Sequence, residues 1–186
     1  MTKPTGLVLP PRFDPHVPWI TGRYYDNYSG TISQVSVGAD TLRATYLYLP
    51  DGEGFDQIAI NVSVGASAGK LARLGVYAIG ADGYPSTLLI DGGAVAIDAT
   101  GDRTVSITTP PPGGQWYAIA SLLQESATIA VVQATHAQSF GRASAGVVSG
   151  ISVFKTSVSY GALPSPFPSS PTVGASNAPL HTVRAI

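Results

Sequence analysis

The stretch from Leu71 to Leu89 constrains the fold more than any other part of the chain, because it contains two alternating runs separated by a turn. In the first run Leu74, Val76 and Ala78 fall on one face at a period of two residues. The residues that follow tolerate a positive φ or fix φ, as a tight reversal requires: Gly80, Asp82, Gly83 and Pro85. An apolar run resumes at Thr87–Ile90, so the stretch predicts a β-hairpin.

Short alternating runs recur along the chain. The clearest is 57–64, which places Ile58, Ile60, Val62 and Val64 on one face. Further strands are expected at 31–37, 43–49, 94–97, 104–108, 115–122, 129–134 and within 147–160. Charged residues make up only 11% of the chain, against about 25% in an ordinary domain, and the helix formers Glu and Lys are scarce. We therefore predict one all-β domain, with nine or ten short strands in a sandwich or barrel.

The N-terminal residues 1–22 form a predicted arm, followed by a β-sandwich domain over 23–186. Five prolines among the first 18 residues exclude a helix interior and favour an extended segment. The arm also carries large apolar side chains that a free tail would lack, and we take four of them as attachment residues: Leu7, Leu9, Phe13 and Trp19. Two alternatives stay open, namely docking on a neighbouring subunit and packing along the chain's own domain.

The amino-acid sequence of several segments resembles that of a β-sandwich module in the virion proteins of tailed bacteriophages and gene transfer agents. The similarity lies in the RLGVY and TLLIDGGAV strands, in GQWYAIA at 114–120, and in GRYY at 22–25 and GALP at 161–164. Such modules occur in tail fibres, head fibres and spikes. The resemblance spans residue 22 to the C-terminus and implies an antiparallel, jelly-roll-like β-sandwich.

Aromatic side chains are the residues best suited to binding a ligand here. Nine Tyr and two Trp are present, and such rings stack on sugars with little loss of conformational entropy. The candidates for glycan binding are Tyr24, Tyr25, Tyr28, Tyr46, Tyr48 and Tyr84. The alternative for the tyrosines near Trp19 is that they fix the arm in place. We expect a further three rings to pack the core: Tyr77, Trp116 and Tyr117.

Catalytic and metal-binding motifs are not found in the sequence. His16, His136 and His181 are far apart in loop-like contexts, and we expect them at the surface. Ser67 matches G-x-S-x-G literally, but a β-strand rather than a helix is predicted after it, so we regard the match as chance. The 9 Asp and 2 Glu fall mostly in turns, where they cap backbone donors. We predict a protein that is not an enzyme and has no metal or cofactor.

Net charge and the composition of individual segments limit the classes of partner that the chain could bind. A formal net charge of −1 with scattered basic residues gives no basis for nucleic-acid binding, and no apolar stretch is long enough to insert into a membrane. The proline-broken N-terminus is not a signal peptide, which indicates synthesis in the host cytoplasm. The low charge favours a homo-oligomer, and the resemblance implies a trimer.

The expected function is that of a structural virion protein, a fibre, spike or tail-tip module. Its arm would attach to capsid, portal, neck or tail subunits, and its loops would bind a host surface polysaccharide. Two alternatives remain: a capsid decoration or cement protein without a receptor role, and a stand-alone carbohydrate-binding module.

Overall fold

Short strands make up the chain, as the alternating pattern predicts. The structure, a computed structural model, describes residues 19–26, 32–132, 153–174 and 178–186. Within them lie thirteen strands: β1 Tyr24–Tyr25, β2 Ile32–Val37, β3 Thr41–Leu49, β4 Phe55–Val64, β5 Leu71–Ile79, β6 Pro85–Ala96, β7 Gly101–Ser106, β8 Gln115–Leu123, β9 Ala127–Val132, β10 Val153–Ser157, β11 Thr172–Gly174, β12 Ala178–Pro179 and β13 Thr182–Ala185. No helix occurs in these ranges, and so none that is long and apolar enough to cross a membrane.

Strands β2 to β9 form two antiparallel sheets. Sheet A has the order β2-β9-β4-β7, and sheet B has the order β3-β8-β5-β6. Successive strands cross between the sheets or pair as hairpins in the double Greek key of a jelly roll. The predicted jelly-roll-like antiparallel β-sandwich is therefore confirmed, while the arm as far as residue 18 lies outside the described residues.

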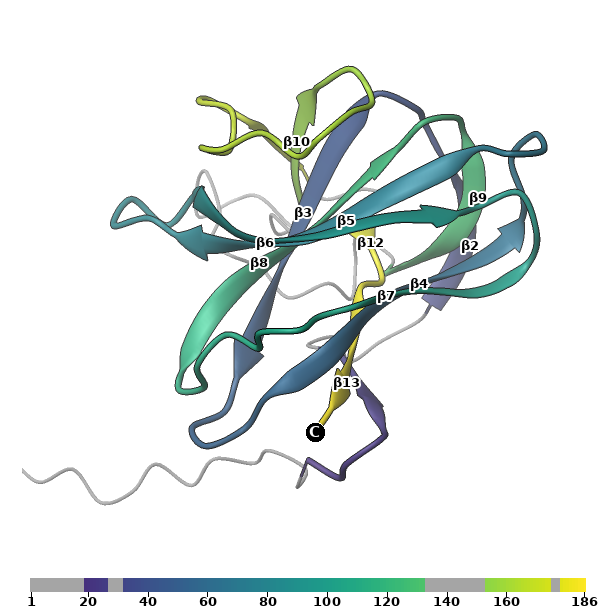
Figure 1. The fold of residues 1–186 in the computed structure, drawn as a ribbon. Coiled ribbons are helices and arrows are strands. Elements are labelled where there is room, and N and C mark those ends of the chain that lie inside the picture. The colour runs from purple at the N-terminus through teal and green to yellow at the C-terminus, as the bar shows by residue number, and fades with distance from the viewer. Residues whose placement is uncertain (1–18, 27–31, 133–152, 175–177) are drawn as a thin grey trace, which may run out of the picture.

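The chain beyond β9 adds to both sheets. Strands β10 and β11 extend sheet B past β3. The C-terminal segment 178–186 enters sheet A where β4 and β9 diverge: β12 pairs with β9, and β13 pairs with β4 on one side and with β1 on the other. In Figure 1 this segment, drawn in yellow, runs down through the sandwich beside β4 and ends next to β1.

The main core lies between the two sheets. It is built from alternate residues of the facing strands, among them Leu47, Ile60, Leu74, Ile119 and Ile129, all at most 2% exposed. The alternation breaks at one predicted position, because Val64 is 60% exposed rather than buried. A register shift between Val62 and Val64 turns the end of β4 away from the core.

A second cluster covers part of the outer face of sheet B. Segment 158–171 folds back over this face and buries Leu163 and Phe167 against Tyr77. The Tyr77 hydroxyl donates a 2.8 Å hydrogen bond to the carbonyl of Pro164. Gly75 lies directly beneath, where a Cβ would collide with the Leu163 side chain. Sheet B is thus buried on both faces over part of its width.

The organising hairpin of the sequence is β5 and β6, joined by the predicted turn. Gly83, with φ of 79°, occupies the turn. Two strands were expected at 87–90 and 94–97, but β6 is continuous. Gly93 adopts a φ of 88° at a register shift opposite Leu74 and Gly75, so a bulge bends the strand without ending it.

Candidate functional site

A line of aromatic rings crosses the outer face of sheet B, partly within the cluster that segment 158–171 covers and partly beyond it. We call it the aromatic row; it consists of Tyr84, Phe154, Tyr46, Trp116 and Tyr48. Successive ring centroids are 5.4, 5.1, 6.5 and 5.3 Å apart. The distances fall within the range of edge and offset contacts between aromatic pairs. The five rings therefore form one continuous chain of aromatic contacts.

The register of the paired strands brings the rings of the aromatic row next to each other. Tyr46 and Tyr48 are alternate residues of β3 and point to the same face, and Tyr48 lies directly opposite Trp116 on β8. Phe154 comes from β10, on the other side of β3, and Tyr84 from the β5–β6 turn. Trp116 and Tyr84 are 43% and 38% exposed, so the two exposed rings stand at separate points of the row with the buried Phe154 between them.

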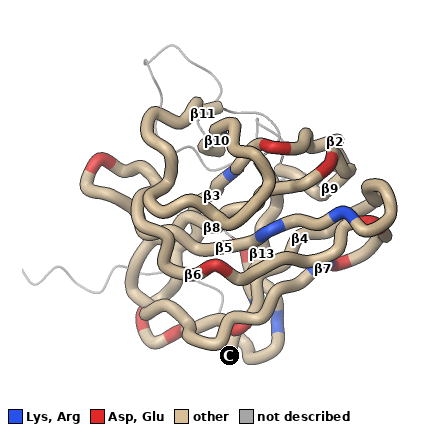
Figure 2. The backbone as a smooth tube through the Cα atoms, turned by 45° about the horizontal axis from the view of Figure 1, so that its top comes forward, with Lys and Arg blue, Asp and Glu red and all other residues tan. Residues whose placement is uncertain are grey.

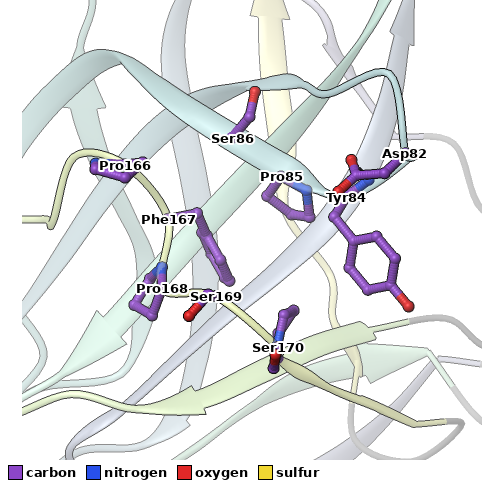
Figure 3. A pocket seen from close by; sticks show the side chains of 10 residues that line it. Asp82, Tyr84, Pro85, Ser86, Pro166, Phe167, Pro168, Ser169 and Ser170 are labelled. Atoms are coloured by element: carbon purple, nitrogen blue, oxygen red, sulfur yellow. Dashed lines mark hydrogen bonds between the residues drawn. The ribbon is translucent and has the colours of Figure 1, made fainter.

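An open pocket lies at the Tyr84 end of the row. It has a volume of about 670 Å³ and is formed by the β5–β6 turn on one side and by residues 166–171 on the other. Figure 3 shows the two segments facing each other, with Phe167 and Pro85 between them and Asp82 beside Tyr84. The Asp82 carboxylate accepts a hydrogen bond of 3.1 Å from the Tyr84 backbone N–H. The pocket thus combines apolar walls with a carboxylate and serine hydroxyls.

The Tyr46 hydroxyl of the row stays protonated, because its pKa is raised. Burial raises the pKa of Tyr46, and the nearby charge of Asp82 and the Tyr84 phenol raise it further. The Tyr46 hydroxyl therefore acts as a neutral hydrogen-bonding group.

The other predicted aromatics lie on sheet A. Tyr25 stacks on Trp19 with ring centroids 4.7 Å apart, and its hydroxyl accepts a hydrogen bond from the backbone N–H of Ile20. The Tyr24 hydroxyl lies 2.6 Å from the side-chain amide of Gln57. Trp19 packs against the main core of its own domain, as in the second alternative for the arm. Three other predicted residues, Leu7, Leu9 and Phe13 of the arm, lie outside the described residues, as does Tyr28.

One aromatic prediction was wrong. Tyr77 and Tyr117 are buried as expected, but Trp116 is 43% exposed. It is the second residue of β8, on the same face as Ala118 and Ala120. Both alanines belong to the cluster beneath segment 158–171. Trp116 lies outside the area that this segment covers. The alternation of β8 was read correctly; which of its faces is left open depends on a distant segment.

A buried polar cluster lies between the sheets. The Nδ1 atom of His181 is 2.7 Å from the Thr45 hydroxyl, and its Nε2 atom is 3.0 Å from the Ser121 hydroxyl. All three side chains are at most 3% exposed. A neutral imidazole donates through one nitrogen and accepts through the other, so both hydroxyls are satisfied. The expectation of a surface histidine is wrong for His181, because the C-terminal segment carries it into the sandwich; His16 and His136 lie outside the described residues.

Acid should weaken the fold through this histidine. Burial lowers the pKa of His181 to about 3, whereas an unfolded histidine titrates near 6.5. Below that pH the unfolded chain gains a proton that the folded chain does not, so the free energy of unfolding falls as the pH falls. We expect a loss of about 2.5 kcal/mol between about pH 7 and pH 4.5 in urea unfolding. Carboxylates such as Asp56, whose pKa the hydrogen bond from Arg184 lowers, contribute at lower pH; no change over this interval would contradict the prediction.

The literal G-x-S-x-G match has an ordinary structural role. The Ser67 hydroxyl donates a 2.7 Å hydrogen bond to Glu125, and Ser67 lies between strands β4 and β5, not before a helix. In the part of the chain that the structure describes, no three His, Asp or Glu side chains gather as a metal-binding group.

No protein-family model and no curated protein matches the chain. Among solved structures, it is similar to the cysteine protease and lectin-like domains of Cwp84, a surface layer associated protein of Clostridium difficile. The identity is 12% and the TM-score 0.46, over 81% of this chain and 33% of that chain. The chain thus spans about a third of the length of that protein.

Proposed function

We propose that this chain is a non-enzymatic, carbohydrate-binding jelly roll whose sugar-binding surface is the aromatic row with the adjoining pocket. The observation that carries the proposal is the contiguity of the row: three of the six predicted glycan residues, Tyr46, Tyr48 and Tyr84, come together around Trp116 and Phe154. Exposed rings on a rigid sheet offer flat apolar faces to the C–H faces of a sugar. The pocket supplies a carboxylate and hydroxyls to the sugar's own hydroxyl groups.

The setting we propose is the virion of a tailed phage or gene transfer agent, in a fibre, spike or tail-tip module. The support is the sequence resemblance, together with the low charge, which suits a subunit packed in a homo-oligomer such as a trimer. The arm would dock on capsid, portal, neck or tail subunits, and the aromatic row would face the host polysaccharide. The exposed rings of Trp116 and Tyr84 favour this receptor role over that of a cement protein.

The test is retention on immobilised polysaccharides, measured by affinity electrophoresis over a panel of bacterial surface glycans. We expect retention of the native protein on at least one glycan, weakened about tenfold or more by Trp116→Ala or Tyr84→Ala, because each removes an exposed stacking face. The matched control is Tyr24→Ala, which removes a ring that is 44% exposed on the other sheet and should leave retention unchanged. Retention lost in Tyr24→Ala and kept in Trp116→Ala would refute the aromatic row as the binding surface.

A further inference from the structure

Two basic residues lie directly opposite each other on the paired strands β3 and β10. Arg43 and Lys155 are Cα partners in the antiparallel register, and both are half-buried. Arg43 is three residues from Tyr46 in β3, so the two side chains point to opposite faces of the strand. Arg43 is two residues from the buried Thr45 and therefore lies on the same face as Thr45. Like charges directly opposite in a sheet destabilise it, so this pair needs a physical reason.

Three other cations in the described part of the chain have acidic partners. Arg73 is 2.9 Å from Asp91, Arg184 is 2.6 Å from Asp56, and Lys70 is 3.8 Å from Glu125. Figure 2 shows how few charged residues the backbone carries and how widely they are spread. In a chain with 10 basic residues, two unbalanced cations side by side are an exception.

Among the residues that the structure describes, neither Arg43 nor Lys155 forms an ion pair with an acidic side chain, and the sequence has no acidic residue after Glu125. The Arg43 Nε atom is buried without a hydrogen-bond partner. Burial lowers the pKa of both side chains, and the charge of Arg43 lowers that of Lys155 further. A buried donor of this kind points to a group missing from the protein alone.

We propose that Arg43 and Lys155 bind an oxyanion, a sulfate, phosphate or carboxylate group. A guanidinium offers a planar edge of N–H donors that matches two oxygens of such a group, and an ammonium adds a point charge beside it. One oxyanion between the two side chains would satisfy the Nε atom and remove the repulsion. The site is distinct from the aromatic row, because it lies on the other face of β3. The anion is either free in solution or an acidic group of a saccharide.

The experiment measures the melting temperature with about 10 mM sodium sulfate, with sodium glucuronate, or with sodium chloride at the same ionic strength. For a site with a dissociation constant of about 1 mM, we expect sulfate or glucuronate to raise the melting temperature of the native protein by roughly 3–5 °C over chloride. Sulfate also stabilises proteins in general by exclusion from their surface. The decisive quantity is therefore the difference between the native protein and the variants.

The variants are Arg43→Gln and Lys155→Gln, with Lys70→Gln as the matched control because Lys70 already has Glu125 as its partner. Without the anion, Arg43→Gln and Lys155→Gln should melt at or above the native temperature, because the repulsion is gone. With it, they should lose the specific shift, whereas Lys70→Gln and Trp116→Ala should keep it. A response to sulfate alone indicates a free anion, and a response to glucuronate indicates an acidic saccharide. Equal shifts in the native protein and both variants, or no shift at all, would overturn the proposal.

Discussion

A chain that ends at residue 177 should lose its cooperative unfolding transition. The missing segment 178–186 fills the fork of sheet A between β4 and β9, and its Ala178, Val183 and Ala185 are at most 1% exposed. Removing it exposes the core residues that face it and leaves the pairing edges of β4, β9 and β1 without partners.

The expected size follows from simple terms. Burial of Leu180 and Val183 stabilises by about 1.5–3 kcal/mol each, and each lost backbone hydrogen bond adds about 1 kcal/mol. The sum is comparable to the total stability of a typical domain, about 5–15 kcal/mol. Urea unfolding followed by near-ultraviolet circular dichroism measures it. The control lacks Ile186 alone, whose side chain is 50% exposed, and should unfold almost as the native protein does; a cooperative transition in the chain ending at 177 would show that the segment is not needed to close sheet A.

The second large effect is expected from His181→Leu, which should destabilise the protein by about 2–5 kcal/mol at neutral pH. The substitution keeps an apolar side chain of similar reach but leaves the buried hydroxyls of Thr45 and Ser121 without their partner. Each buried hydroxyl without a hydrogen bond costs about 1–3 kcal/mol. Equilibrium unfolding in urea measures the loss.

The control replaces all three polar side chains together, as Thr45→Val, Ser121→Ala and His181→Leu, so that no buried hydroxyl is left without a hydrogen-bond partner. Replacing every partner with apolar groups of similar shape is close to neutral, so this variant should recover most of the lost stability. It should also be insensitive to pH between about pH 7 and pH 4.5, because its interior no longer holds an imidazole. A triple variant as weak as the single one would mean that packing, not hydrogen bonding, sets the cost.

Local pattern predicted most of the fold. The alternation in β4 and β5 and the Gly- and Pro-bearing turn before β6 identified the strands, because one buried face imposes a period of two residues. The jelly-roll order came from the resemblance and was confirmed by the strand pairing. At the end of the chain Leu180 and Val183 are buried, whereas Ile186 is half-exposed.

Features that depend on distant segments could not be predicted. The exposure of Trp116 depends on where segment 158–171 stops covering sheet B. The burial of His181 follows from a fork between β4 and β9, for which neither strand carries a local signal. The pairing of Arg43 with Lys155 joins residues whose register is set only when β10 adds to the edge of β3.

The position of β12 and β13 inside sheet A also sets an order for biosynthesis. Domains generally fold as units as the chain leaves the ribosome. Here the strands that complete the middle of a sheet are the last of these residues to be translated. Strand β12 pairs with β9, and β13 pairs with β4, which lies more than a hundred residues earlier in the chain. Nascent chains should therefore expose the unfilled fork of sheet A until translation has passed residue 185. Pairings so distant in sequence also slow folding, so this period is the one in which chaperones have most to protect.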